Sequence, residues 1–363
     1  MGCALAGGSL LLGLVLGEVL LRLLAPPSPT VDHGLYVDDP DPDLCWRLRA
    51  GVRYTGGNGE EVAVNSHGLR DPERPRDKPP GVRRVLVLGD SFTFGSAVGQ
   101  EEPYSRRLEG LLGPGVQVVN GGVPRYSTVQ EQRWLVVHGL AWEPDALVLG
   151  FFVGNDPLEN LTGTRGQDLR VEGGELVDRP KAERSPWRRL RNQSRLYRLF
   201  KDLPALVTDR LRGVTSLERK YRDHEADRMA VCLRQEPSSW VAAWERTREA
   251  LAGIRAAAGA RPVVLLVIPD EFQVDAALRQ AVLAQAGWTE ADFDLDRPQR
   301  RLAELAGELG FERVDPLPEM RALCAAGQRL YVPCDSHWNG EGHRLAAEAL
   351  ARSTALDALR ATR

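Results

Sequence analysis

The chain has 363 residues, of which 43% are hydrophobic and 27% are charged, and its formal net charge is −3. Because charges of both signs are interspersed, the sequence has no basic tail of the kind that binds nucleic acid, and we expect no nucleic-acid partner. None of the five cysteines forms a C-x-x-C pair, which excludes a zinc or redox motif of that type. Cys324 and Cys334 are close enough in sequence to form a bridge outside the cytoplasm.

The first 25 residues form a strongly apolar segment. From residue 3 onward, this run is long enough to span a bilayer as a helix, and its charges, Glu18 and Arg22, lie four residues apart on one helical face. The segment lacks the basic start of a secretory signal, and a proline directly after Ala25 is unfavourable for cleavage. We therefore predict an uncleaved membrane anchor, with the main domain in the periplasm or at the cell surface. A cleaved secretion signal is the alternative, and few flanking charges set the orientation.

Residues 26–80 are rich in Pro, Asp and Gly, which predicts a linker that merges into an N-terminal extension. The main domain is expected over residues 81–360. Its strands are predicted at short apolar runs rich in β-branched residues, at 83–88, 116–119, 146–153, 262–268 and 311–315. Helical patterns are clearest at 102–112, 128–140 and 340–353.

Strands that alternate with helices predict βαβ crossovers, and hence a three-layer αβα sandwich around a central parallel sheet. Residues 157–261 contain no such strand and predict a polar, largely helical insertion that would act as a lid or a substrate-recognition cap. Its tryptophans, Trp187, Trp240 and Trp244, are expected to serve packing. Ligands of open parallel sheets bind beyond the C-terminal ends of the strands, and three of these ends carry polar motifs.

The first motif, GDSFTFG, starts at Gly89, directly after the strand at 83–88. A serine on this turn can project its hydroxyl from the edge of the sheet. The helix that follows offers unpaired backbone N–H groups to a developing oxyanion. A serine that merely caps the helix would give the same pattern, so this motif alone leaves both interpretations open.

The second motif, Asp335-Ser336-His337, precedes the helix at 340–353. A serine needs a base to become a nucleophile near neutral pH, and histidine suits this task because its unperturbed pKa lies near that pH. Asp335 lies two residues before His337, so one tight loop can present the carboxylate that orients the imidazole. Asp335 could instead cap the helix. His343 is the rival base, but it lies within the predicted helix and is expected to be structural.

Two further strand ends carry candidate oxyanion donors. Asn155 follows the strand at 146–153 in the sequence GND, and its side-chain amide can donate to an oxyanion. Gly122 follows the strand at 116–119 in the sequence NGG, where a glycine N–H can approach a substrate oxygen closely. Either motif alone is a weak signal.

In this order, the motifs GDSFTFG, NGG, GND and DSHWN resemble those of the SGNH/GDSL hydrolase superfamily, which is named for Ser, Gly, Asn and His. The resemblance covers residues 83–353 apart from the insertion, and it implies a flavodoxin-like fold. It places Ser91 on the nucleophile and His337 on the base. The oxyanion donors it implies are the Ser91 N–H, Gly122 and Asn155.

Two departures from the family pattern concern the third and fourth motifs. Many members have their aspartate three residues before the histidine, where this chain has Cys334, so the resemblance leaves open whether Asp335 is the third member of the triad. The D-x-H-W spacing is also similar to that of the alginate O-acetyltransferase branch of the superfamily. The usual G-x-N-D is G-N-D here, so only Asn155 of the third motif matches the family residue by residue.

The resemblance implies acyl transfer through a covalent serine intermediate, without a metal or an organic cofactor. If water resolves the acyl-enzyme, the protein is an esterase that acts on an O-acyl ester, for example an O-acetylated carbohydrate. If a sugar hydroxyl does so, the protein is an O-acyltransferase that modifies a cell-envelope polysaccharide. A third interpretation is a non-catalytic envelope protein that keeps the fold.

Overall fold

The computed structural model describes residues 34–56, 59–162, 169–172, 175–178 and 215–360, together with residues 13, 15–21, 23 and 194. The chain divides into two compact units, and the larger one comprises residues 33–177 and 221–363. Most of the predicted anchor lies outside the described residues, although residues 15–21 are helical. Among the residues described, no helix combines the length and the apolar character that crossing a bilayer requires. The anchor therefore stays a prediction.

Five parallel strands form the central sheet in the order β6-β5-β7-β10-β11. This is the 2-1-3-4-5 order of flavodoxin-like sheets, with its topological switch point between β5 and β7. The runs predicted from the sequence are all present, as β5 (Arg83–Leu88), β6 (Val116–Asn120), β7 (Ala146–Phe152), β10 (Val263–Ile268) and β11 (Glu312–Val314).

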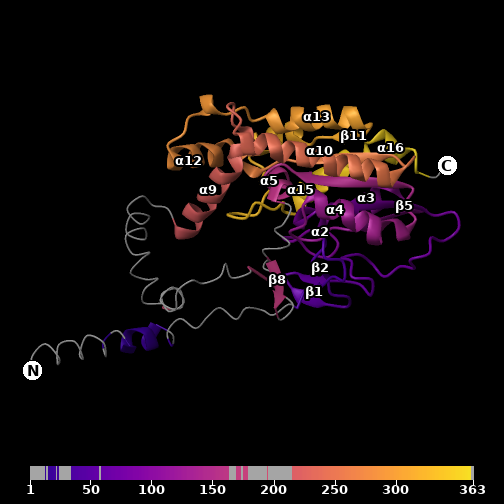
Figure 1. Cartoon of the computed structure of the whole chain (residues 1–363), viewed down its shortest axis with the longest axis horizontal. Coiled ribbons are helices and arrows are strands. Elements are labelled where there is room, and N and C mark those ends of the chain that lie inside the picture. Colours follow the sequence, from indigo (N-terminus) through magenta and orange to yellow (C-terminus); the bar gives the residue numbers. More distant parts are fainter. Residues whose placement is uncertain are drawn as a thin grey trace, which may run out of the picture. The chain divides into compact units, whose positions relative to one another are not determined.

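Successive residues of each strand enter two separate cores, one on each face of the sheet. Val85 packs in one core with residues of α3 (Tyr104–Leu112) and α15 (Gly340–Ala351). Leu86 packs in the other with residues of α10 (Ser238–Ala258). Both faces are therefore buried, which explains why the strands read as continuous apolar runs. Figure 1 shows the helices layered against the sheet.

The remaining helices are short connections or complete these layers: α2 (Ser91–Phe94), α4 (Thr128–Trp134), α5 (Asp156–Thr162), α9 (Ser216–Met229), α11 (Glu271–Val274), α12 (Ala276–Ala286), α13 (Arg297–Leu309), α14 (Leu317–Ala325) and α16 (Thr354–Asp357). A π-helical segment, Leu135–Gly139, extends α4. Single 3₁₀ turns lie at Leu140–Trp142, Ala230–Cys232 and Glu290–Asp292. No disulfide joins Cys324 to Cys334.

The N-terminal extension folds onto the α/β domain. Two antiparallel hairpins, β1 (Tyr36–Asp38) with β2 (Trp46–Leu48) and β3 (Arg53–Thr55) with β4 (Glu61–Ala63), place apolar side chains such as Trp46 in the core. The buried Arg70 donates to the carbonyl oxygens of Val98 and Gly99 at 2.6 and 2.7 Å. The extension thus holds the loop that follows α2.

Both ends of the range predicted as an insertion belong to the packed domain. Helix α5 packs against α10, and Trp240 and Trp244 of α10 are buried in the core. The packing expected for these two tryptophans is confirmed, whereas Trp187 lies outside the described residues. Between these helices, the described residues form a two-stranded sheet of β8 (Leu169–Glu172) and β9 (Glu175–Asp178), followed by α9.

Candidate active site

Ser91 lies at the C-terminal edge of the sheet because the turn after β5 is tightly packed. Gly89 has a φ of +153°, and a Cβ atom there would lie 2.0 Å from Thr93 Oγ1, so only glycine fits. Asp90 then begins α2, and its Oδ1 accepts from the N–H of Phe92 at 2.9 Å. Ser91 is the first residue of the helix, where backbone N–H groups have no intrahelical partner.

Three residues predicted from two separate motifs meet at this edge. His337 Nε2 lies 2.7 Å from Ser91 Oγ, and His337 Nδ1 lies 2.6 Å from Asp335 Oδ1. An ionised carboxylate only accepts hydrogen bonds, so Nδ1 carries the ring proton and Nε2 is left to accept from the Ser91 hydroxyl. The hydroxyl, imidazole and carboxylate form one continuous hydrogen-bonded chain.

The loop that carries His337 is closed by its own hydrogen bonds. The N–H of Val332 donates to His337 O at 3.0 Å, and the N–H of Asp335 donates to Val332 O at 3.0 Å. The N–H of His337 also donates to Asp335 Oδ1 at 3.1 Å. The Phe92 ring lies 5.1 Å from the imidazole and fixes it from the side of α2. The imidazole is therefore held in place from the loop and from α2.

The pKa of Asp335 matches the role of an ionised partner. Partial burial opposes ionisation, but the hydrogen bond and the charge of His337 together hold the pKa of Asp335 below its ordinary value. The carboxylate stays ionised at neutral pH and can stabilise a protonated His337.

His343 occupies a different environment. It is buried in the core, and its Nδ1 accepts from the N–H of Tyr104 at 3.2 Å. Burial lowers the pKa of His343 to about 3, so the ring is neutral over the physiological range. The expected structural role agrees with these contacts.

The two other predicted oxyanion donors have different surroundings. Asn155 is half-buried, and its acceptor atom, Oδ1, has no hydrogen-bond partner in the part of the chain that the structure describes, whereas the donor to an oxyanion would be its Nδ2 amide. The N–H of Gly122 instead donates to Asn120 Oδ1 at 3.0 Å. A Cβ atom at Gly122 would lie 2.4 Å from Phe94 N, so close packing against α2 also requires glycine there. The contribution of Gly122 to an oxyanion hole stays a prediction.

A cluster of buried carboxyl groups includes Asp90, the neighbour of Ser91 in the chain. Asp90 and Asp156 each use one oxygen to accept a backbone N–H, at 2.9 Å from Phe92 and 2.8 Å from Phe152. Their second oxygens, and both oxygens of Glu131, are buried without a hydrogen-bond partner among the described residues. Burial and mutual repulsion raise the pKa values of Glu131 and Asp156 well above the ordinary range, so these two groups hold protons near neutral pH. The sequence analysis did not identify Glu131.

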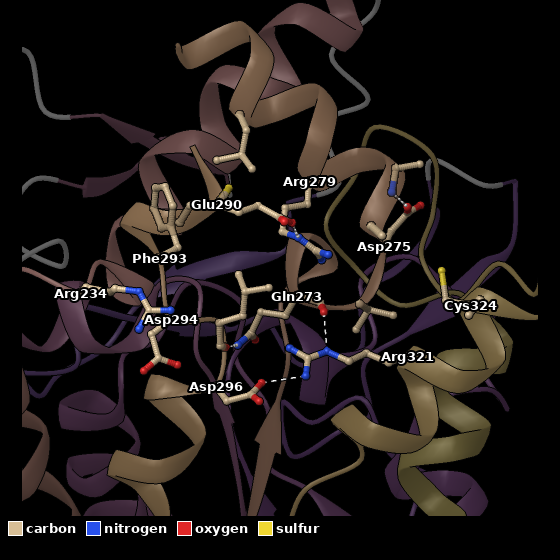
Figure 2. A pocket seen from close by; sticks show the side chains of 17 residues that line it. Arg234, Gln273, Asp275, Arg279, Glu290, Phe293, Asp294, Asp296, Arg321 and Cys324 are labelled. Carbon is tan, nitrogen blue, oxygen red and sulfur yellow. Dashed lines mark hydrogen bonds and ion pairs between the residues drawn. The ribbon is translucent and has the colours of Figure 1, made fainter. Parts of the chain in front are cut away.

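A separate pocket of about 780 Å³ lies on α11, α12, α14 and the segment before α13 (Figure 2). No triad residue lines it. Two ion pairs join side chains of its lining, Arg321 with Asp296 at 2.7 Å and Arg279 with Glu290 at 3.2 Å. In the described part of the chain, no group of His, Cys, Asp and Glu side chains is arranged to hold a metal ion.

No protein-family model and no curated protein matches the chain. Among solved structures, it is similar to a lipase/acylhydrolase from Enterococcus faecalis, with 14% identity, a TM-score of 0.40 and coverage of 75% of this chain and 94% of that one. It is similar to an acetylxylan esterase from Geobacillus stearothermophilus, with 13% identity, a TM-score of 0.41 and coverage of 76% and 95%. A two-domain esterase active on acetylated mannans has 13% identity and a TM-score of 0.39, with coverage of 77% of this chain and 50% of that one.

Proposed function

We propose that the protein is a serine-dependent ester hydrolase of the SGNH/GDSL type. The observation that carries this proposal is the hydrogen-bonded chain from Ser91 Oγ through His337 to Asp335, with distances of 2.7 and 2.6 Å. A nucleophile, a base and an orienting carboxylate at hydrogen-bonding distance are the arrangement that acyl transfer through a serine requires. Its place at the C-terminal edge of a parallel sheet, where ligands of this fold class bind, also supports it.

In the proposed mechanism, Ser91 Oγ attacks the ester carbonyl while His337 Nε2 takes its proton. Asp335 stabilises the imidazolium, which then protonates the departing alcohol. Water attacks the acyl-enzyme, with His337 again as the base, and releases the acid and the free serine. The Ser91 N–H and the Asn155 amide would hold the oxyanion, and a preorganised donor of this kind contributes about 3 kcal/mol. Gly122 would join them by turning its N–H away from Asn120.

The proposed substrate is an O-acyl ester, for example an O-acetylated carbohydrate, and the reaction as written consumes only water. An O-acyltransferase is the second candidate, and one observation favours it. Asp335, two residues before His337, is the carboxylate that contacts the imidazole, which is the D-x-H spacing that resembles the acetyltransferase branch. A sugar hydroxyl would then replace water in the second half of the reaction.

The proposal is tested with Ser91→Ala and p-nitrophenyl acetate. We expect kcat/KM to fall by at least about 10³-fold, because the nucleophile is lost while the binding groups remain. Ser96→Ala is the matched control, since Ser96 lies just beyond α2 and its hydroxyl lies outside the triad. Equal turnover in the wild type and Ser91→Ala would end the hydrolase proposal. Labelled acetyl groups that appear on an added polysaccharide would favour the transferase.

A further inference from the structure

One face of α9 carries charged side chains into the domain. Tyr221, Glu225 and Arg228 lie four and three residues apart, which places them on the same side of the helix. The Arg228 guanidinium donates to Glu225 Oε1 at 3.0 Å and lies 3.9 Å from Asp270 Oδ2. Both carboxylates have fully buried side chains, and 14% of the Arg228 side chain is exposed. We call Glu225, Arg228 and Asp270 the arginine network.

The arginine network contacts the turn that carries Asn155. Asp270 follows β10 after Pro269, and its carboxylate occupies the space beside Gly154. A Cβ atom at Gly154 would lie 2.0 Å from Asp270 Oδ2 and 2.6 Å from the Phe152 ring, so the turn and the carboxylate are in direct contact. The position of Asp270 therefore limits where the Asn155 amide can lie.

A second contact leads from the arginine network to the triad. Arg228 Cζ lies 5.2 Å from the centre of the Phe152 ring. The Phe152 ring lies 4.5 Å from Phe92, which in turn lies 5.1 Å from His337. The positive charge of Arg228 also contributes to the lowered pKa of Asp335. Arg228 therefore acts on the site through packed rings and through its charge.

We propose that Arg228 and Asp270 are positioning residues for ester hydrolysis, Asp270 by fixing the Asn155 turn and Arg228 by fixing Asp270 and acting electrostatically on the triad. This inference rests on the proposed hydrolase function. A buried ion pair is by itself weak evidence for stability, because desolvation offsets much of its attraction, and well-packed apolar residues often replace such pairs without loss. The contacts of this network with Gly154 and Phe152 supply a functional reason for its presence.

The test compares Arg228→Gln with Arg246→Gln in the full-length protein, using p-nitrophenyl acetate and active-site titration with a phosphonate ester. The two arginines form the same kind of i,i+3 pair, since Arg246 contacts Glu249 at 2.7 Å, but 47% of the Arg246 side chain is exposed. We expect Arg228→Gln to lower kcat per titrated site about 10-fold, the range of one misplaced catalytic contact, with KM within about 2-fold. Arg246→Gln should change neither quantity.

The pH–rate profile separates positioning from a merely structural role. The charged groups that act on Asp335 are His337 in its own loop, Arg228 of α9 and Glu271 of α11. Losing the positive charge of Arg228 favours protonation of the hydrogen-bonded Asp335–His337 pair, so the acid limb of kcat should move to higher pH, and Arg228→Lys should restore it. An unmoved acid limb with unchanged kcat per titrated site would overturn the inference.

A double variant keeps the test valid if the single variant does not fold. Arg228→Gln with Glu225→Gln replaces both members of the 3.0 Å pair with amides, so the Glu225 carboxylate is not left buried opposite an uncharged side chain. We expect the folded double variant to show the same lowered kcat and the same displaced acid limb. Full activity of the double variant would overturn the inference. Turnover that persists in Ser91→Ala would instead refute the hydrolase function itself.

Discussion

Two kinds of carboxyl side chain lie near Ser91, and they differ in burial, in hydrogen-bond partners and in the direction of their pKa shifts. Asp335 is 46% exposed at its side chain, is paired with His337, and has a lowered pKa. Glu131 and Asp156 are buried, have oxygens without partners among the described residues, and have strongly raised pKa values. The same chemical group is ionised in one place and protonated in the other.

The difference shows what decides the role of a carboxyl group beside a nucleophile. A hydrogen-bond donor that can become positively charged favours the ionised form, whereas burial without such a partner favours the protonated form. Only the ionised group can stabilise the imidazolium. The protonated groups are instead buried, and Asp156 accepts the N–H of Phe152.

Removing His337, the partner of Asp335, is expected to have the largest effect on activity. His337→Gln should lower kcat/KM for p-nitrophenyl acetate by at least about 10³-fold, because Ser91 loses its base. The melting temperature should change little, since the His337 side chain lies at a partly exposed edge. His67→Gln serves as the control outside the site. Turnover within 10-fold of wild type would show that Ser91 has another base.

The next largest effect on activity is expected when aspartate is replaced by asparagine, at Asp335 and at Asp156 in separate variants. Asp335→Asn should lower kcat about 10²-fold, since an amide can favour the wrong imidazole tautomer and carries no charge to stabilise the imidazolium. Asp156→Asn should lower kcat by less than about 3-fold, because the amide oxygen can still accept the N–H of Phe152. Steady-state kinetics on both variants checks this, and equal losses would erase the distinction between the two groups.

The smallest effect expected is on stability. A carboxyl group with a raised pKa binds its proton more tightly in the folded state, so its favourable contribution is full below the unfolded pKa and is lost as the pH rises. Removing this group with Glu131→Gln should therefore stabilise the fold at pH 8 relative to its effect at pH 5, by roughly 1.4 kcal/mol for each pH unit over which the folded protein holds the proton and the unfolded chain has lost it. Urea unfolding at the two pH values measures this, with the exposed Glu245→Gln as the control. A pH-independent difference would mean that Glu131 is already ionised.

The sequence was sufficient to predict the strands and the triad because both leave local signals. Buried parallel strands are unbroken apolar runs. Ser91 follows one of them after a Gly-Asp turn, and Asp335 and His337 stand in a polar motif just before α15. Asp270 had the same signal, since it ends the run PVVLLVIPD, and we overlooked it. Arg228 had none, because α9 is charged along its whole length and its sequence does not show which face is buried.

Other features depended on contacts between distant segments. Glu131 lies in a short polar helix, and only the neighbouring segments bury it. The hydrogen bond from Gly122 to Asn120 depends on the exact path of the backbone after β6, which the motif NGG does not encode. The position of α10, at the end of the predicted insertion 157–261, was also set by packing. Its tryptophans join the core, whereas a surface cap would expose them.

The loop from Val332 to His337 holds the acid and the base of the triad on one short, internally bonded piece of chain. Any rigid displacement of that piece preserves the contact between Asp335 and His337 and alters a single separation, the one from imidazole to hydroxyl. The activity of such a site depends on one distance, from His337 Nε2 to Ser91 Oγ. A shift of about 1 Å in this distance would therefore suffice to inactivate Ser91, while the hydrogen bond between Asp335 and His337 stays intact.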